Sequence, residues 1–336
     1  MSEIKVNKIK VIAEIAQGYE GDFTQSKLFV KAASSSNADA VKFQLVYADE
    51  LCTKDYKYYD LFKSLEMPFK NWNLLNDYAN ELQIEFIVDI FGLKSLEVAE
   101  KLNLKSVKVH ATDITNIELI KKISDSKINS VILGIGGAFW HEIEEVLKIL
   151  KNKKISVLLG FQGYPTKTED NHIRRLLHLK NKVAEVHNNF QIGFAPHPGE
   201  NDFQNILSLT AVGAGAQIIE KHLTLGKIMK IEDYESALNP DEFYEYVKQL
   251  KFSSLSYGEI NNFQKLSISE ENYRNFARKD VVASYDLKKG TILNSENLTL
   301  KRTGLEGALK NIRELYGKKL LRTVKKDEII LKSSIY

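Results

Sequence analysis

Eight short runs of apolar, β-favouring residues recur along this 336-residue chain, each followed by a segment whose apolar residues repeat at helical spacing. The runs cover residues 9–16, 40–44, 85–91, 106–109, 130–133, 155–159, 191–194 and 217–221, and the helical segments include 26–36, 72–82, 93–102, 117–124 and 140–150. Most runs are apolar throughout rather than alternating, which indicates a parallel sheet covered by helices on both faces. Eight such units, with no Gly-x-Gly-x-x-Gly motif after the first, predict an α/β fold closed into a (β/α)₈ TIM barrel.

The pattern changes after a helical segment predicted over residues 240–255. Residues 252–279 are polar and irregular, and short extended runs then follow at 281–283, 292–293 and 298–300, separated by turn signals such as Lys289-Gly290. We therefore predict a barrel domain over residues 1–258, a linker over 259–279 and a small β-rich domain over 280–336. A domain of this size has a marginal core of its own, so we expect it to dock on another surface.

The composition argues against nucleic-acid and membrane partners. The 47 basic and 44 acidic residues nearly cancel, and the formal net charge is +3. The first residues mix charged with apolar side chains and do not resemble a signal peptide or a membrane span. The single cysteine, Cys52, excludes an internal disulfide framework and a cysteine-rich metal site, so we expect a reducing compartment, the cytoplasm.

Polar side chains stand at the ends of the apolar runs, where the active site of a TIM barrel lies. They are Glu14, Gln17, Lys42, Gln44, Asp89, Lys108, His110, Asp113, His197, Glu220, Lys221 and His222. Charged groups buried at strand ends are costly unless they are paired or bind a ligand, so the set predicts a functional site. The alternative is that some of them form ion pairs that close the barrel core. We favour function for Glu14, Lys42 and Lys108, and a packed or hydrogen-bonded role for His110.

His197 and His222 follow neighbouring predicted strands. Two imidazoles at adjacent strand ends could bind a divalent metal, with carboxylate or water completing the coordination. They could equally be two hydrogen-bonded core histidines. The spacing alone leaves both interpretations open.

Several motifs, taken together and in order, resemble the N-acetylneuraminate (sialic acid) synthase family. The matching motifs include Asp113-Ile114-Thr115-Asn116 and Tyr164-Pro165-Thr166, and the specific ones are Ala38-Asp39-Ala40-Val41-Lys42-Phe43-Gln44 and Ile219-Glu220-Lys221-His222. In the terminal domain, Lys288-Lys289-Gly290 and Lys301-Arg302-Thr303-Gly304 resemble the antifreeze-like (SAF) domain of those enzymes. The resemblance runs from about residue 9 to the end of the chain.

The resemblance implies that phosphoenolpyruvate condenses with an open-chain N-acylated aldose to give a nonulosonic 2-keto acid and phosphate. It implies Mn²⁺ or Mg²⁺ on His197 and His222, and a domain-swapped homodimer in which Arg302 reaches the site of the other subunit. By position, Asp113 matches an acid near C2 of the donor, and Lys42 and Lys108 match cations that face the donor. The expected catalytic residues are Glu14, Lys42, Lys108 and Asp113, and the expected substrate-binding residues are Gln44, Asp89, Phe91, Gln162, Tyr164, Lys221, Asp233 and Arg302.

The chain departs from the family where the family holds the donor phosphate with hydroxyl groups. The corresponding residues here are Asp89, Ala111, Gly134 and Ala195, none of which carries a hydroxyl. A carboxylate at Asp89 would repel phosphate, and charge-assisted hydrogen bonds of about 1.5–3 kcal/mol each would be missing. Thr112 or the backbone around Gly134, Gly136 and Gly137 could form a replacement cradle.

Two alternatives follow from this departure. One is an aldolase-type enzyme that uses a phosphate-free donor such as pyruvate, with either the metal or a Schiff base on Lys42 or Lys108 activating the donor. The other is a non-catalytic sugar-binding protein. The clustered charges of Glu14, both lysines, both histidines and Asp233 argue against the second.

Overall fold

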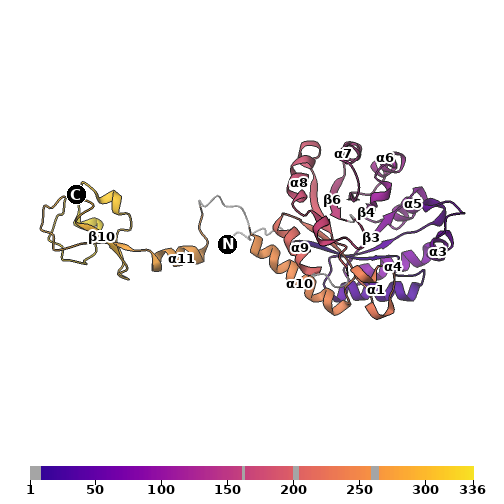
Figure 1. The fold of residues 1–336 in the computed structure, drawn as a ribbon, viewed down its shortest axis with the longest axis horizontal. Helices are drawn as coiled ribbons and strands as arrows, with labels where there is room; N and C mark the ends of the chain where they lie inside the picture. The colour runs from indigo at the N-terminus through magenta and orange to yellow at the C-terminus, as the bar shows by residue number, and fades with distance from the viewer. Residues whose placement is uncertain (1–8, 161–162, 200–203, 259–264) are drawn as a thin grey trace. The chain divides into compact units, whose positions relative to one another are not determined.

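A computed structural model describes residues 9–160, 163–199, 204–258 and 265–336. Its first unit is a closed barrel of eight parallel strands in the order β1 to β8, as predicted (Figure 1). The strands are β1 (Lys10–Ala16), β2 (Ala40–Gln44), β3 (Glu85–Ile90), β4 (Ser106–Val109), β5 (Ser130–Gly134), β6 (Lys154–Gly160), β7 (Phe190–Ala195) and β8 (Ile218–His222). The barrel closes where β1 pairs with β8, and Glu14 stands opposite both Lys42 and His222 in the strand register.

Helices surround the strands (Figure 1). Those that follow the strands are α1 (Phe23–Ser35), α4 (Phe69–Glu81), α5 (Leu93–Lys101), α6 (Ile117–Asp125), α7 (Trp140–Ile149), α8 (Arg175–Val186), α9 (Gln204–Gly213) and α10 (Pro240–Tyr257). Two short helices, α2 (Ala48–Leu51) and α3 (Tyr59–Ser64), lie in the connection between β2 and α4. Among the described residues, none of the helices is long and apolar enough to span a bilayer.

Helix α1 begins three residues earlier than its apolar spacing predicts, because Asp22 caps it. The carboxylate of Asp22 accepts a hydrogen bond of 2.6 Å from the backbone N–H of Gln25. An N-terminal cap of this kind satisfies one of the unpaired N–H groups of the first turn.

Asp22→Ala is expected to lower the free energy of unfolding by about 1 kcal/mol, because that N–H loses its acceptor. Urea denaturation measures the loss, and Asp22→Asn, which keeps an acceptor oxygen, is the matched control. Equal losses in the two variants would contradict the capping role.

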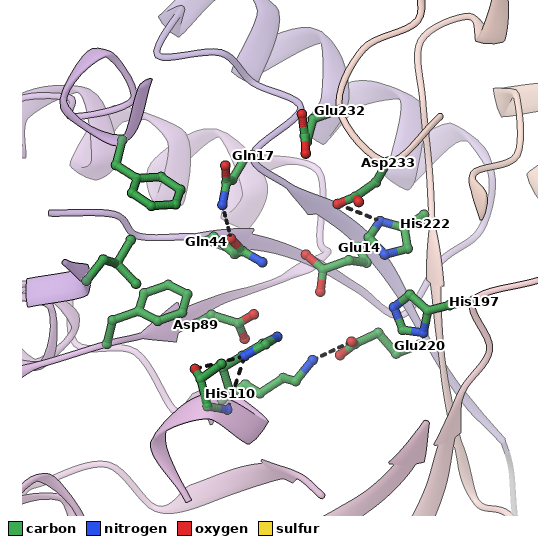
Figure 2. A pocket seen from close by; sticks show the side chains of 15 residues that line it. Glu14, Gln17, Gln44, Asp89, His110, His197, Glu220, His222, Glu232 and Asp233 are labelled. Carbon is green, nitrogen blue, oxygen red and sulfur yellow. Dashed lines mark hydrogen bonds and ion pairs between the residues drawn. The ribbon is translucent and has the colours of Figure 1, made fainter. Parts of the chain in front are cut away.

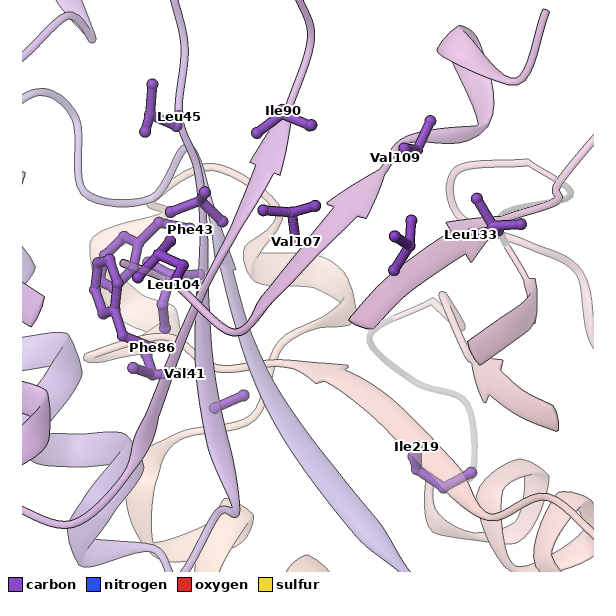
Figure 3. Close-up of a cluster of buried hydrophobic side chains, with 14 of the residues drawn as sticks. Val41, Phe43, Leu45, Phe86, Ile90, Leu104, Val107, Val109, Leu133 and Ile219 are labelled. Atoms are coloured by element: carbon purple, nitrogen blue, oxygen red, sulfur yellow. The ribbon is translucent and has the colours of Figure 1, made fainter. Parts of the chain in front are cut away.

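Alternate residues of each strand face opposite sides of the barrel wall. One set packs against the helices, and Figure 3 shows part of this layer, including Val41, Phe43, Phe86 and Leu133. The other set faces the barrel interior, where a separate buried apolar cluster contains Ile12, Ala40, Ile87, Ile132, Leu158, Ala195 and Ile218. Most of this interior cluster lies two residues before the polar side chains that end each strand, so it forms the floor beneath them.

The second compact unit spans residues 260–336. Its sheet pairs β9 (Asp280–Ala283) with β10 (Leu298–Lys301) in antiparallel fashion, and a small core includes Val281, Leu287 and Leu298. The predicted run at 292–293 forms only an isolated bridge between Ile292 and Lys319.

The expectation that residues 252–279 are irregular is wrong. Helix α10 continues to Tyr257, and α11 (Ile268–Ala277) begins at a capping box between Ser267 and Glu270. The apolar side chains of α11, Ile268, Tyr273 and Phe276, are exposed. Helix α11 has few apolar residues and buries none of them in a core, so no core-facing apolar stripe marked it in the sequence.

Candidate active site

A cavity of about 260 Å³ opens at the carboxyl ends of the barrel strands. It is lined by Glu14, Gln17, Gln44, Leu51, Phe62, Asp89, Phe91, Lys108, His110, Thr112, His197, Glu220, His222, Glu232 and Asp233. Figure 2 shows Glu14 between Gln44 and the two histidines, with Asp233 beside His222. The side chains come from both halves of the barrel, so the closed sheet is what brings them together.

A layer of five buried charged residues forms the deepest part of the site: Glu14, Lys42, Asp89, Lys108 and Glu220. We call it the charged layer. The Lys42 ammonium pairs with Glu14, lies 2.8 Å from Asp89 and lies 3.7 Å from Glu220. Lys108 contacts Glu220 at 2.5 Å. The charged layer therefore holds three carboxylates against two ammonium groups.

Burial and pairing set opposite pKa directions for the two lysines. Burial lowers the pKa of Lys42, although Asp89 and Glu220 act against it. Burial also acts to lower the pKa of Lys108, but Glu220 and Asp89 together raise it above its usual range. For Glu220, burial acts upward, yet Lys108 and Lys42 bring its pKa down to about 2. Glu220 is therefore an anion at neutral pH and Lys108 a cation.

Two carboxylate oxygens of the charged layer, Asp89 Oδ1 and Glu220 Oε2, are buried without a hydrogen-bond partner among the described residues. A buried unpaired acceptor is costly, and in a native structure it indicates a ligand, a water or an ion that completes its bonding. Both residues line the cavity. Both oxygens can therefore accept a hydrogen bond from a water molecule or a substrate in the cavity.

His197 and His222 form one wall of the cavity, with ring centroids 5.1 Å apart. Burial lowers the pKa of His197 to about 3, and burial also takes the pKa of His222 well below its usual value. Both rings are therefore neutral at pH 7, which is the form that binds metal. His197 Nδ1 lies 2.8 Å from the carbonyl oxygen of Ala195, a contact that orients the ring and places the lone pair on Nε2.

The two imidazoles of this wall could supply two of the ligands of a divalent ion. His222 Nδ1 lies 3.8 Å from a carboxylate oxygen of Asp233. Within the described ranges there is no group of three or more His, Cys, Asp or Glu side chains arranged to hold an ion. Two imidazoles would therefore need water or substrate oxygens to complete the coordination.

Comparison with known proteins decides the family. The NeuB family model matches residues 29–262, and the SAF domain model matches residues 279–335. This chain belongs to the NeuB family. The resemblance that the sequence motifs predicted is confirmed.

Among its NeuB relatives, the N,N'-diacetyllegionaminic acid synthase of Campylobacter jejuni is 31% identical over 97% of this chain and 99% of that protein. The N-acetylneuraminate-9-phosphate synthase of Homo sapiens is 26% identical over 97% of this chain and 92% of that protein. Among solved structures, the N-acetylneuraminic acid (sialic acid) synthetase of Leptospira borgpetersenii, in complex with citrate, is similar with a TM-score of 0.73 and 27% identity, over 83% of this chain and 96% of that one.

The NeuB barrel brings most of the predicted site residues together. Glu14, Gln44, Asp89, Phe91, Lys108, His197, His222 and Asp233 line the cavity. Lys42 is fully buried in the charged layer beneath it. Tyr164 is half-exposed, and its ring lies 6.1 Å from that of His197. The roles assigned to these residues stay predictions.

Lys221 does not join them, contrary to expectation. Glu220 and His222 face the barrel interior, so Lys221 between them faces the helices, as its register partner Ala13 does. It is fully buried, and its ammonium has no hydrogen-bond partner in the described structure. Burial lowers the pKa of Lys221 to about 7.

The remaining predicted site residues are Asp113, Gln162 and Arg302. Asp113 sits in the 3₁₀ turn η1 (Ala111–Asp113), is absent from the cavity lining, and accepts hydrogen bonds from the side chains of Thr112 and Asn116. Gln162 lies outside the described residues. Arg302 belongs to the second unit, where its Nε donates to the carbonyl oxygen of Ala277.

The sequence prediction missed other cavity residues. Glu220 was predicted among the polar strand ends but was assigned no role, although its position two residues before His222 puts both on the same face of β8. His110, expected only to pack or form hydrogen bonds, does contact Thr112 Oγ1 at 3.1 Å but also lines the cavity. Leu51, Phe62 and Glu232 come from loops or short helices and had no periodic signal.

Asp233 gives the site a pH dependence. Burial, together with the nearby Glu232, raises its pKa to about 6. Because this lies above the unfolded value near 4, the protonated carboxyl contributes stability that is fully present below about pH 4 and is lost as the pH rises through about 6.

In metal-free protein, Asp233→Asn is expected to remove this component of the pH dependence, on the order of 1–3 kcal/mol between pH 4 and pH 7. Urea denaturation of both proteins in EDTA at pH 4.5 and pH 7 measures it. The same pH slope in the variant and the unmodified chain would refute the assignment.

Proposed function

We propose that this NeuB protein joins a three-carbon pyruvyl unit to an open-chain N-acylated aldose, giving a nonulosonic, sialic-acid-like 2-keto acid. The observation that carries the proposal is the buried charged layer standing directly beside the neutral pair of His197 and His222. In such a site, Lys108 in the charged layer would face a small acidic donor, and the two histidines would face a metal-bound carbonyl group. The family relatives named as legionaminic, pseudaminic and sialic acid synthases support the same reaction class.

The donor implied by the family is phosphoenolpyruvate, and pyruvate is the alternative. In either case C3 of the donor attacks C1 of the aldehyde. With phosphoenolpyruvate, water then adds at C2 and phosphate leaves. With pyruvate, a base first removes a proton from C3, and no group leaves the donor. A lysine Schiff base on Lys42 is disfavoured, because its nitrogen is held by Glu14 and Asp89.

The residues of the site divide between donor and acceptor. His197 and His222 would hold Mn²⁺ or Mg²⁺, which supplies Lewis-acid polarisation of the aldehyde when bound. The protonated Lys108 offers a counter-ion to the donor carboxylate. The side-chain amide of Gln44, which accepts a hydrogen bond of 2.9 Å from Gln17, can bind sugar hydroxyls. The carboxyl of Asp233 can do the same.

The coupled assay uses full-length protein with Mn²⁺ and N-acetylmannosamine, and scores 2-keto acid formation with phosphoenolpyruvate and, separately, with pyruvate. A keto-acid product with either donor supports the proposed condensation. Absence of product with both donors, while Mn²⁺ binds, would instead favour the sugar-binding alternative.

We further propose a cytoplasmic, domain-swapped homodimer in which Arg302 contacts the acceptor sugar of the other subunit. The support is the family resemblance of the SAF domain, whose model matches residues 279–335. Size-exclusion chromatography with light scattering tests the dimer. Complementation between an Arg302→Ala chain and a His222→Ala chain tests the swap, since a mixed dimer would regain one intact site.

A further inference from the structure

We infer that the donor half of this site accepts a phosphate-free 2-keto acid, of which pyruvate is the smallest, and rejects phosphoenolpyruvate. The inference rests on the proposed condensation and names its donor class. Four features of the donor side carry it: the charge of the buried layer, the position of Asp89, the lining of the adjoining pocket and the engagement of Thr112.

The charged layer has no surplus cation for a phosphate group. Glu14, Asp89 and Glu220 contribute three negative charges, and Lys42 and Lys108 contribute two positive ones. If Lys42 lost its proton, the layer would become still more negative. Among the described residues that line the main cavity, Lys108 is the one lysine or arginine, and Glu220 shares it at 2.5 Å. Lys108 can therefore face a single donor carboxylate, which leaves no further cation for a phosphate group.

The carboxylate of Asp89 is what makes the formal net charge of the charged layer negative. Without its carboxylate the remaining two acids and two lysines would cancel. Its Oδ2 lies 2.8 Å from Lys42, and its buried Oδ1 has no hydrogen-bond partner in the described chain and belongs to a residue that lines the cavity. An unpaired carboxylate oxygen repels a phosphate dianion at short range, and it accepts protons or hydrogen bonds instead.

The neighbouring pocket offers a phosphate group no side-chain hydroxyl. Its volume is about 30 Å³, room for only a few water molecules. Its lining residues are Lys108, His110, Ala111, Gly134, Gly136, Leu158, Gly160, Ala195 and His197. None of these side chains is a hydroxyl, the group that would surround phosphate oxygens with hydrogen-bond donors.

Thr112 carries the one side-chain hydroxyl among the described residues lining the main cavity, and this hydroxyl is already engaged. Thr112 Oγ1 donates to Asp113 at 3.0 Å and contacts His110 Nδ1 at 3.1 Å, while the Thr112 backbone N–H points to the same ring nitrogen at 3.4 Å. The Ile135 N–H, next to Gly134 and Gly136, donates to the carbonyl oxygen of Leu158. The threonine hydroxyl and the Ile135 amide are therefore already used within the fold.

The condensation of pyruvate with the aldose needs no leaving group and only a base from the charged layer. A C3–H bond breaks, its electrons form the bond to C1 of the aldose, and the aldehyde oxygen gains a proton, so all atoms of both reactants remain in the product. Removal of the C3 proton needs a basic oxygen close to the donor. Asp89 Oδ1, which has no hydrogen-bond partner among the described residues and belongs to a cavity-lining residue, is such an oxygen.

Isothermal titration calorimetry of Mn²⁺-loaded full-length protein tests the inference with pyruvate, phosphoenolpyruvate and inorganic phosphate. Pyruvate is expected to bind at least tenfold more tightly than phosphoenolpyruvate. Asp89→Asn and Asp89→Thr are expected to close that gap at least tenfold, because each removes the surplus charge. Glu85→Gln is the matched control on the same strand, since its carboxylate pairs with Lys10 at the opposite end of the barrel and should leave the preference unchanged.

The turnover assay separates this inference from the proposed function. Product from phosphoenolpyruvate with stoichiometric phosphate release would leave the condensation standing and overturn the donor assignment. Product from pyruvate alone supports both. If neither donor gives product, the condensation fails, while the calorimetric order still decides the donor class. Equal binding of both donors, or binding of neither, would overturn the inference.

Discussion

Lys42→Met is expected to lower the free energy of unfolding by about 3–5 kcal/mol, the cost of breaking a buried ion pair and leaving its partner charged. Lys42 is fully buried, and Glu14, Asp89 and Glu220 all depend on its ammonium group. Methionine has nearly the same length as lysine, so the lower free energy of unfolding would arise from the missing charge rather than from a cavity. Urea denaturation followed by circular dichroism measures it.

Lys63→Met provides the control for an exposed ion pair. Lys63 is half-exposed and lies 3.0 Å from Glu66, and such pairs contribute about 1 kcal/mol or less. A deficit as small as that of Lys63→Met would show that water already screens the charged layer.

His222→Ala is expected to abolish stoichiometric Mn²⁺ binding and to lower turnover at least about a hundredfold, since Lewis-acid polarisation contributes several kcal/mol and each 1.36 kcal/mol is tenfold in rate. His222 and His197 are the two imidazoles on the cavity wall. Electron paramagnetic resonance of Mn²⁺ titrated into the protein reads binding directly, independently of activity.

His141→Ala is the matched control, because His141 is an exposed histidine on helix α7. It should leave both the Mn²⁺ stoichiometry and the turnover unchanged. Full Mn²⁺ binding by His222→Ala, with lost turnover, would instead assign His222 a role toward the substrate rather than the metal.

The barrel was predictable from the sequence because each of its strands is buried on both faces. Such strands are apolar runs bounded by helical spacing, and β2 and β4 were predicted with the bounds that the structure shows. The site residues Glu14, Lys42 and Asp89 were predictable for a related reason. A charged side chain that ends a buried strand is an exception to the pattern, and in this fold such exceptions gather at one end.

Whether a strand-end side chain faces the cavity or the helices depends on the alternation of residues along the strand, which the sequence prediction did not take into account. Glu220, Lys221 and His222 were treated as one polar end, whereas alternation sends Lys221 to the helix side. Leu51 and Phe62 could not be predicted at all. They lie in the connection between β2 and α4, where no repeating pattern fixes which side chain turns toward the cavity.

That connection has a consequence for how the protein can change. The charged layer is built on strands whose register is fixed by the barrel, whereas Leu51 and Phe62 reach the cavity from short helices outside the sheet. Substitutions or insertions there can reshape the cavity wall without moving the ionised groups of the charged layer. Directed evolution of acceptor preference should therefore begin between residues 48 and 64, where mutational tolerance and contact with the cavity coincide.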